Sequence, residues 1–259
     1  MTALRSFAFV VWMYGLMALY GTIGAPVLAF NRNIVRKAYK SFVYLMLGGL
    51  RVLCGVTYRV EGLEHVPQGP ILVAMKHQSM FDTMIVSLLF QDPVVVMKKS
   101  LAKLPFFGWY ALRLGNIPVD RDAHMQALKA LVRTAKARTE AGLQVVIFPE
   151  GTRSEPGERI AYKPGVAAIY KALDLPCVPV AHNSGLCWPP QGLVRRPGEI
   201  VIRVLPPVPA GLNRKTFMAE IEERIETASA ELLPAPLHAR ALGPSGAFAP
   251  CVEPGDQRV

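Results

Sequence analysis

Residues 71–90 read ILVAMKHQSMFDTMIVSLLF, and this stretch decides the fold. It opens on a continuous apolar run, passes through a polar turn at 76–79 and continues as a second apolar run from Thr83 to Phe90. A short apolar run that stops at polar residues is typical of a buried strand, and the run after it suits a helix. The stretch therefore predicts a strand that delivers a polar turn to the start of a helix.

The chain on either side repeats this alternation. Short apolar or β-branched runs predict strands at Val56–Glu61, Pro70–Met75, Val94–Met97, Asn116–Val119, Leu143–Phe148, Cys177–Ala181 and Ile200–Leu205. Helical periodicity predicts helices at Ala123–Ala141, Gly165–Leu173 and Asn213–Leu232. Strands that alternate with helices predict an α/β domain over residues 56–232, with a mostly parallel sheet flanked by helices.

The N-terminal segment differs from the rest in composition. Phe7–Phe30 has no charged residue, and a helix over Phe7–Ala25 would rise about 28 Å, close to the hydrocarbon thickness of a bilayer. Asn31–Lys40 is basic, and the second apolar run, Ser41–Leu50, is too short to span. Residues 1–55 are therefore predicted to form a two-helix membrane-associated segment that leaves the domain on the cytoplasmic side. A buried core hairpin and a cleaved signal peptide are the alternatives.

Composition limits the remaining choices. A formal net charge of +10 suits nucleic acid, an anionic bilayer or phosphorylated substrates. Nucleic acid is excluded because an apolar segment precedes the domain and the cations are not interleaved with aromatic residues. The scattered cysteines indicate reduced thiols and no metal site; they are Cys54, Cys177, Cys187 and Cys251. The tail, 233–259, is rich in Pro, Gly and Ala and is predicted to be poorly ordered.

His77 and Asp82 form the first candidate constellation. His77 is expected at the carboxyl end of a strand and Asp82 at the start of a helix, where α/β sheets place their ligands. The turn between them can fold the carboxylate against one ring nitrogen, which leaves the other free to take a proton as a general base. The alternative is an ordinary loop histidine followed by a helix-capping aspartate.

A group of cations follows two other predicted strands. Lys98 and Lys99 come after Val94–Met97, and Arg121 comes after Asn116–Val119. Because each follows the end of a strand, they are expected to gather on one edge of the sheet, where Arg121 can hold a phosphate bidentately. A solvated charge run is the alternative.

The turn after Leu143–Phe148 is expected at the same edge. Pro149 and Gly151 mark a tight turn whose backbone amides suit an anion, and Glu150, Thr152 and Arg153 add polar groups for a phosphorylated headgroup. The alternative is an ordinary turn. His182, at the end of another predicted strand, has no acidic residue near it in the sequence and is predicted to be structural.

Together these segments resemble the glycerolipid acyltransferase family, specifically the bacterial 1-acyl-sn-glycerol-3-phosphate acyltransferases. That family is marked by His-x-x-x-x-Asp, then Gly-x-x-x-x-Asp-Arg, then Phe-Pro-Glu-Gly-Thr-Arg-Ser and then Val-Pro-Val, and all four occur here in that order. The resemblance implies that His77 is the general base and Asp82 its orienting partner. It also implies that Arg121, with Lys98 or Lys99, binds the phosphate of the acceptor, and that the acceptor site is shaped by Glu150, Gly151, Thr152 and Arg153. One departure is Lys76, where the family frequently has Asn.

The resemblance also implies a reaction and its partners. A fatty acyl group would move from acyl-CoA or acyl-carrier protein to the sn-2 hydroxyl of lysophosphatidate, forming phosphatidate in phospholipid biosynthesis. No cofactor is expected, because the thioester carries the acyl group. The enzyme is expected on the cytoplasmic face of the bacterial inner membrane, among membrane lipids. Two alternatives stay open: acylation of another lysophospholipid or a lyso-aminolipid, and a catalytically silent lipid-binding protein.

Overall fold

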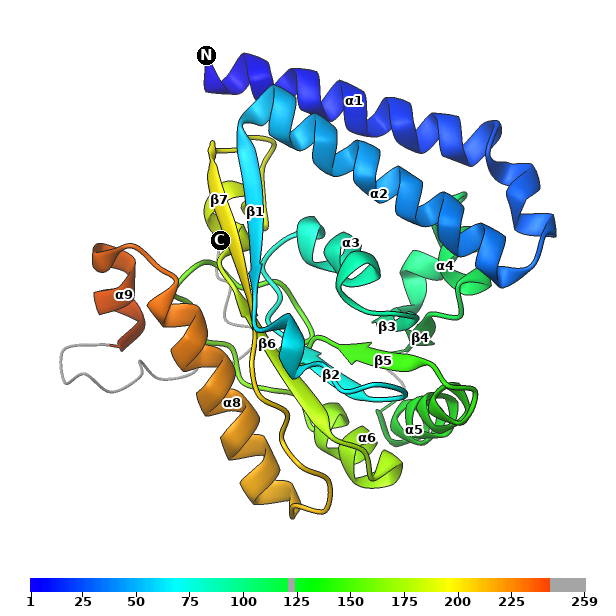
Figure 1. The fold of residues 1–259 in the computed structure, drawn as a ribbon, viewed down its shortest axis with the longest axis vertical. Helices are drawn as coiled ribbons and strands as arrows, with labels where there is room; N and C mark the ends of the chain where they lie inside the picture. Colours follow the sequence, from blue (N-terminus) through cyan, green and yellow to red (C-terminus); the bar gives the residue numbers. More distant parts are fainter. Residues whose placement is uncertain (121–123, 243–259) are drawn as a thin grey trace.

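A seven-stranded sheet with helices on both faces forms the centre of the structure, a computed structural model that describes residues 1–120 and 124–242 (Figure 1). The strands are β1 (Val56–Glu61), β2 (Leu72–Met75), β3 (Pro93–Lys98), β4 (Ile117–Val119), β5 (Gln144–Ile147), β6 (Cys177–His182) and β7 (Gly198–Val204). The helices are α1 (Thr2–Thr22), α2 (Arg32–Cys54), α3 (Met80–Leu89), α4 (Phe107–Arg113), α5 (His124–Glu140), α6 (Gly165–Leu173), α7 (Ser184–Cys187), α8 (Arg214–Glu231) and α9 (Ala235–Leu242). Short 3-10 turns are η1 (Ala25–Ala29), η2 (Leu63–His65) and η3 (Lys99–Lys103). The predicted α/β fold is confirmed.

The strand order is β1-β7-β6-β2-β5-β3-β4. Among the strands of the described residues, the block from β6 to β4 is parallel throughout, β1 is parallel to β7, and the β6–β7 pair is antiparallel. The five strands of the parallel block therefore end on one edge of the sheet, called here the carboxyl edge. Polar segments that follow these strands lie where open α/β sheets bind their ligands.

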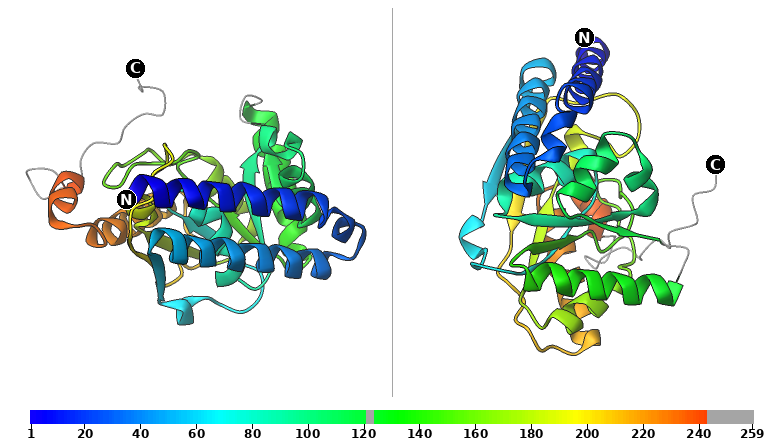
Figure 2. Two further views of the ribbon diagram at one scale, coloured as in Figure 1. Left: turned by 90° about the horizontal axis from the view of Figure 1, so that it is seen from above. Right: turned by 90° about the vertical axis from the view of Figure 1, so that its right-hand side faces the viewer.

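Side chains of the central strands alternate between two cores. In β2, Val73 and Met75 pack into a core with residues of α1, α2 and α3, whereas Leu72 and Ala74 pack into a core with residues of α5, α6 and α8. Figure 2 shows α1 and α2 on one side of the sheet and α5 on the other. Because both faces of β2 are covered, its sequence is a continuous apolar run rather than an alternating one.

The two N-terminal helices have other bounds than predicted. α1 begins at Thr2 and ends at Thr22, whereas the prediction was Phe7–Ala25. α2 is continuous from Arg32 to Cys54, so the basic stretch and the second apolar run are one helix. The side chain of Asn31 caps its start by accepting a hydrogen bond from the backbone N–H of Ile34, and Gly55 ends it in the left-handed conformation.

α1 has one packed face and one uncovered apolar face. Phe9 and Met13 are buried in the core shared with α2 and the sheet, while Phe7, Val11 and Tyr14 are more than half exposed. By length and composition α1 is the one described helix able to cross a membrane. Part of the segment predicted as a membrane anchor therefore also completes the core of the domain.

Among the described residues, three helices were not predicted: α4, the four-residue α7 and α9. α4 is short and is tied to η1 because Arg113 donates hydrogen bonds to the backbone carbonyls of Leu28 and Phe30. α9 lies in the segment predicted to be a poorly ordered tail, and its Ala241 packs with Ala230 and Leu233. α9 thus occupies the first part of that segment, and residues 243–259 lie outside the described part of the chain.

Candidate active site

Four neighbouring strands bring polar segments to the carboxyl edge. His77 follows β2, the turn 149–154 follows β5, Lys98 ends β3 and His182 ends β6. Because β6, β2 and β5 are direct neighbours in the sheet, the end of β2 lies about 5 Å from the ends of β6 and β5. β3 is the second neighbour of β2 and lies about 10 Å from it. The site is thus built from segments that are far apart in the sequence.

The imidazole of His77 is held by Asp82 on one side. Nδ1 of His77 lies 3.0 Å from Oδ2 of Asp82, and the ring stacks on Phe148 with 4.2 Å between centroids. The side chain of Asp82 is fully buried, whereas that of His77 is 14% exposed. No described residue forms a hydrogen bond with Nε2 of His77. The arrangement fixes the ring and its tautomer with one nitrogen bonded to the carboxylate, as in a base that receives a proton on the other.

Asp82 is surrounded by hydrogen-bond donors. Besides His77, its Oδ2 accepts from the backbone N–H groups of Gln78 and Ser79, each at 2.7 Å. Its Oδ1 accepts from the hydroxyls of Ser79 at 2.9 Å and Ser184 at 2.6 Å. As the third residue of α3 it also lies in the positive end of the helix dipole. Asp82 is therefore both a helix-capping residue and the partner of His77.

The charge of Asp82 is stable despite burial. Burial alone would raise the pKa of this carboxyl, but the neighbouring N–H of the His182 imidazole and the hydrogen bonds from His77 and Ser184 outweigh it and hold the pKa well below its usual range. Asp82 is therefore ionised at neutral pH and can stabilise a positive charge on His77.

His182 and Ser184 support this carboxylate, although neither was predicted as a site residue. His182 is fully buried, donates from Nε2 to the carbonyl oxygen of Lys76 at 2.7 Å and accepts at Nδ1 from the backbone N–H of Ser184. Burial lowers the pKa of His182, which is consistent with this neutral tautomer. Its Nε2 lies 3.6 Å from Oδ1 of Asp82. The position of both residues at the end of β6 was the available signal, since β6 ends beside β2.

The turn 149–154 is fastened directly to His77. The backbone N–H of Ser154 donates to the carbonyl oxygen of His77 at 2.8 Å, and the Ser154 hydroxyl donates to the same oxygen at 3.1 Å. Gly151 has φ of +72°, in the left-handed region that glycine adopts at least cost. Thr152 and Arg153 are exposed and available to a ligand at this edge.

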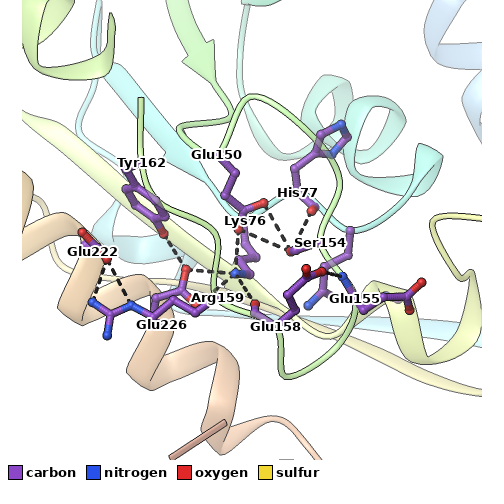
Figure 3. Close-up of polar contacts among 12 residues, drawn as sticks. Lys76, His77, Glu150, Ser154, Glu155, Glu158, Arg159, Tyr162, Glu222 and Glu226 are labelled. Atoms are coloured by element: carbon purple, nitrogen blue, oxygen red, sulfur yellow. Dashed lines mark hydrogen bonds and ion pairs between the residues drawn. The ribbon is translucent and has the colours of Figure 1, made fainter. Parts of the chain in front are cut away.

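Glu150 faces inward rather than toward a ligand. Its side chain is fully buried and one oxygen lies 2.6 Å from the ammonium nitrogen of Lys76. Glu226 of α8 reaches the same ammonium at 2.9 Å (Figure 3). Glu150 was predicted to line an acceptor site in this turn. Its side chain instead supports the turn from the buried side.

The predicted cations are spread along the same edge. Lys98 and Lys99 are exposed, and Lys99 forms an ion pair with Asp120 at 3.0 Å. Arg121, predicted as the main phosphate ligand, lies outside the described residues. No group of three or more His, Cys, Asp or Glu side chains within 1–120 and 124–242 is arranged to hold a metal ion.

Comparison with known proteins gives the family of this chain. The acyltransferase family model matches residues 57–183. A 1-acyl-sn-glycerol-3-phosphate acyltransferase of Pseudomonas aeruginosa is 33% identical over 86% of this chain and 88% of its own length. The enzyme of that name from Saccharomyces cerevisiae is 28% identical over 68% of this chain and 59% of its own length.

A solved structure agrees in fold. The crystal structure of the 1-acyl-sn-glycerophosphate acyltransferase of Thermotoga maritima superposes with a TM-score of 0.75 at 22% identity, covering 90% of this chain and 98% of that one. The matched residues 57–183 contain both His77 and Asp82 as well as the turn 149–154. The chain therefore belongs to the acyltransferase family, among the 1-acyl-sn-glycerol-3-phosphate acyltransferases.

Proposed function

We propose that this enzyme transfers a fatty acyl group from an acyl thioester to the sn-2 hydroxyl of lysophosphatidate, with His77 as the general base and Asp82 as its orienting partner. The observation that carries the proposal is the 3.0 Å contact between Nδ1 of His77 and the buried Asp82 carboxylate, with Nε2 left for the hydroxyl. A positioned base of this kind contributes about 10²–10⁴ to a rate.

The chemistry balances without a covalent acyl-enzyme. Nε2 of His77 takes the proton of the sn-2 hydroxyl as the oxygen attacks the thioester carbonyl carbon, and a tetrahedral oxyanion forms. Collapse of that oxyanion breaks the carbon–sulfur bond, and the thiolate leaves with the proton held by His77. The buried charge of Asp82 stabilises the imidazolium between the two proton transfers. No redox step or cofactor enters this sequence.

The acceptor is recognised by its phosphate. Lys98 and Lys99 lie at the carboxyl end of β3, Arg153 lies beside Thr152 in the turn after β5, and Arg121 comes two residues after β4 in the sequence. Cations at the edge that holds a catalytic base favour an acceptor whose negative group lies close to its reacting hydroxyl. Lysophosphatidate has this form, because its sn-3 phosphate lies one carbon from the sn-2 alcohol.

The acyl chains of both substrates explain a location at a membrane. The uncovered apolar face of α1, with Phe7, Val11 and Tyr14, suits the interface of the bilayer that holds the lysolipid. The basic residues of α2, among them Lys37 and Lys40, favour the anionic cytoplasmic leaflet. We place the enzyme on the cytoplasmic face of the bacterial inner membrane, with α1 as its anchor.

A substrate matrix tests this function. Purified full-length protein in detergent is supplied with labelled oleoyl-CoA or oleoyl-acyl-carrier protein, each with lysophosphatidate, lysophosphatidylcholine, lysophosphatidylethanolamine or a lyso-aminolipid. Labelled phosphatidate as the dominant product supports the proposal, and the better donor identifies the physiological thioester. A product formed only from another lysolipid would replace the acceptor, and no product from any pair would favour a lipid-binding protein.

A further inference from the structure

A buried ion cluster lies directly behind the proposed base. The ammonium of Lys76, the residue before His77, is 2% exposed and contacts one oxygen of Glu150 at 2.6 Å and both oxygens of Glu226 at 2.9 Å (Figure 3). Its remaining donor reaches the carbonyl oxygen of Glu158 at 3.2 Å. The hydroxyl of Tyr162 donates to Glu226 at 2.9 Å. The three donors of the ammonium are thus all used.

Stability alone is a weak reason for such a cluster. Two carboxyl groups share one ammonium with little exposure to solvent, and burial raises the pKa of Glu150 to about 8. The desolvation of buried charges commonly cancels their attraction, and apolar residues of similar volume often replace a buried ion pair without loss of stability. The cluster therefore calls for a second role.

Lys76 connects the parts of the site that flank His77. Its backbone N–H donates to Val180 of β6 at 3.0 Å, and its carbonyl oxygen accepts from His182, which lies against Asp82. Its ammonium holds Glu150, the start of the turn that ends on His77.

The Ser154 hydroxyl contacts both Glu150 and the backbone of His77. It lies 3.3 Å from the Glu150 carboxylate and 3.1 Å from the carbonyl oxygen of His77. The hydroxyl has one proton and donates to one of these oxygens at a time, so its contacts with both keep Glu150 next to the backbone of His77. A shift of Glu150 would displace Ser154 and, with it, the turn held against the base.

We propose that Lys76 is a positioning residue for acyl transfer: its ammonium fixes Glu150, and through it the turn 150–154, against His77, while Glu226 of α8 serves as the counter-ion. This inference rests on the proposed function of His77 and of the turn. It gives a positioning role to Lys76, which stands where the family frequently has Asn.

The surroundings keep Lys76 charged. Burial alone would lower the pKa of its ammonium, but the charges of Glu150 and Glu226 outweigh burial and raise it. Burial raises the pKa of Glu150, and Lys76 opposes that rise. The other ionisable groups around the cluster are Tyr162 and the Arg159–Glu222 pair, together with His182 on the β6 side.

Three variants separate positioning from stability. Lys76→Met removes the ammonium and leaves the buried carboxylate of Glu226 without its counter-charge. Lys76→Met/Glu226→Gln also lacks the ammonium but leaves no carboxylate of α8 unpaired in the cluster. Glu226→Gln keeps the contact between Lys76 and Glu150. For each, kcat, the apparent KM for lysophosphatidate, the apparent KM for the acyl donor and the Tm are measured beside wild type.

We expect the double variant to recover stability without recovering activity. Because a displacement of about 1 Å in an active site can cost about 10²-fold, kcat should fall about 10–100-fold in both Lys76 variants, with a rise in the KM for lysophosphatidate that exceeds the change for the donor. The Tm should fall in Lys76→Met and recover in the double variant. Glu226→Gln should keep kcat within about threefold of wild type, because the Lys76–Glu150 contact remains.

Two outcomes overturn the proposal. Wild-type kcat and KM values in the double variant would show that Lys76 acts only through stability. A loss in Glu226→Gln as large as in Lys76→Met would show that Glu226, rather than Lys76, holds the turn. The wild type in the same assay keeps the two proposals apart, because its failure to acylate lysophosphatidate would count against the proposed function instead.

Discussion

The carboxylate of Asp82 contacts Nδ1 of His77 at 3.0 Å with one oxygen, while the hydroxyls of Ser79 and Ser184 hold the other. Because the serine hydroxyls and two backbone N–H groups fix the carboxylate, its orientation does not depend on His77. The imidazole is instead oriented by a group that is already in place. This preorganisation suits a base whose charge appears only during the reaction.

Asp82→Asn should lower kcat about 10²–10⁴-fold while the fold is retained. An amide oxygen in the place of Oδ2 still accepts the backbone N–H groups of Gln78 and Ser79, so α3 keeps its cap. The negative charge that stabilises the imidazolium is lost. Steady-state kinetics and circular dichroism check both parts.

Asp174→Asn is the matched control for that change. Asp174 ends α6 in the left-handed conformation, which asparagine also tolerates, and it is remote from the carboxyl edge. Its kcat should equal that of wild type. An Asp82→Asn enzyme as active as this control would remove the orienting role of Asp82.

The buried neutral His182 should make stability depend on pH. Because its pKa is lowered in the folded state, the unfolded chain binds this proton more readily, and the free energy of unfolding should fall as pH drops below about 6.5. One proton contributes at most about 1.4 kcal/mol per pH unit. Urea unfolding between pH 5 and 8 measures this slope.

Comparison of His182→Gln with wild type isolates the contribution of His182 to the pH dependence of stability, since the other histidines are common to both proteins. The variant should be less stable at pH 7.5 and should show a flatter dependence on pH. Equal slopes in the two proteins would mean that His182 is not held neutral.

Arg121→Ala should weaken binding of the acceptor lysophosphatidate more than binding of the acyl donor. Loss of a charge-assisted contact of about 1.5–3 kcal/mol would raise the apparent KM for lysophosphatidate about 10–100-fold and leave that for the acyl donor nearly unchanged. Lys136→Ala, an exposed cation on α5, serves as the control. Equal changes in both KM values would argue against a phosphate contact.

Charges on the uncovered face of α1 should release the enzyme from membranes. Val11→Asp/Tyr14→Asp places carboxylates where exposed apolar side chains would enter the interface, whereas Phe9 and Met13 keep the helix on the core. Co-sedimentation with vesicles of anionic phospholipid should fall strongly, with an unchanged Tm. Met125→Asp, on the opposite side of the sheet, should still co-sediment; unchanged binding of the α1 variant would contradict the anchor.

Deleting residues 1–55 is a less informative test of the anchor. The segment supplies Phe9, Met46 and Leu50 to the core beneath the sheet, so its loss would unfold the domain as well. The sequence pattern predicted an apolar segment but not that its inner face completes the core, because a partner of Phe9 is Trp188, far along the chain, whose ring meets that of Phe9 edge to face with 5.4 Å between centroids.

The strands could be predicted because each is marked by an apolar run in the local sequence. β1 has the predicted bounds, and β2 and β5 differ by one or two residues at their ends, since each apolar run stops at turn residues. The helices α4, α7 and α9 were missed because short helices show little periodicity, and long-range packing decides them.

The site was predictable only where spacing is short. His77 and Asp82 are five positions apart, so one turn brings them together. Ser184 is 102 positions from Asp82, and Glu226 is 150 positions from Lys76, so neither contact is visible without the strand order. The short local motif also hid the inward direction of Glu150, which follows from burial beside Lys76.

The role of His77 as the base is tested by acyl transfer with His77→Ala beside wild type, with the labelled donor and lysophosphatidate both saturating. We expect phosphatidate from the wild type and a kcat at least about 10²-fold lower for the variant, with an unchanged Tm. A variant that retains the wild-type kcat would contradict it.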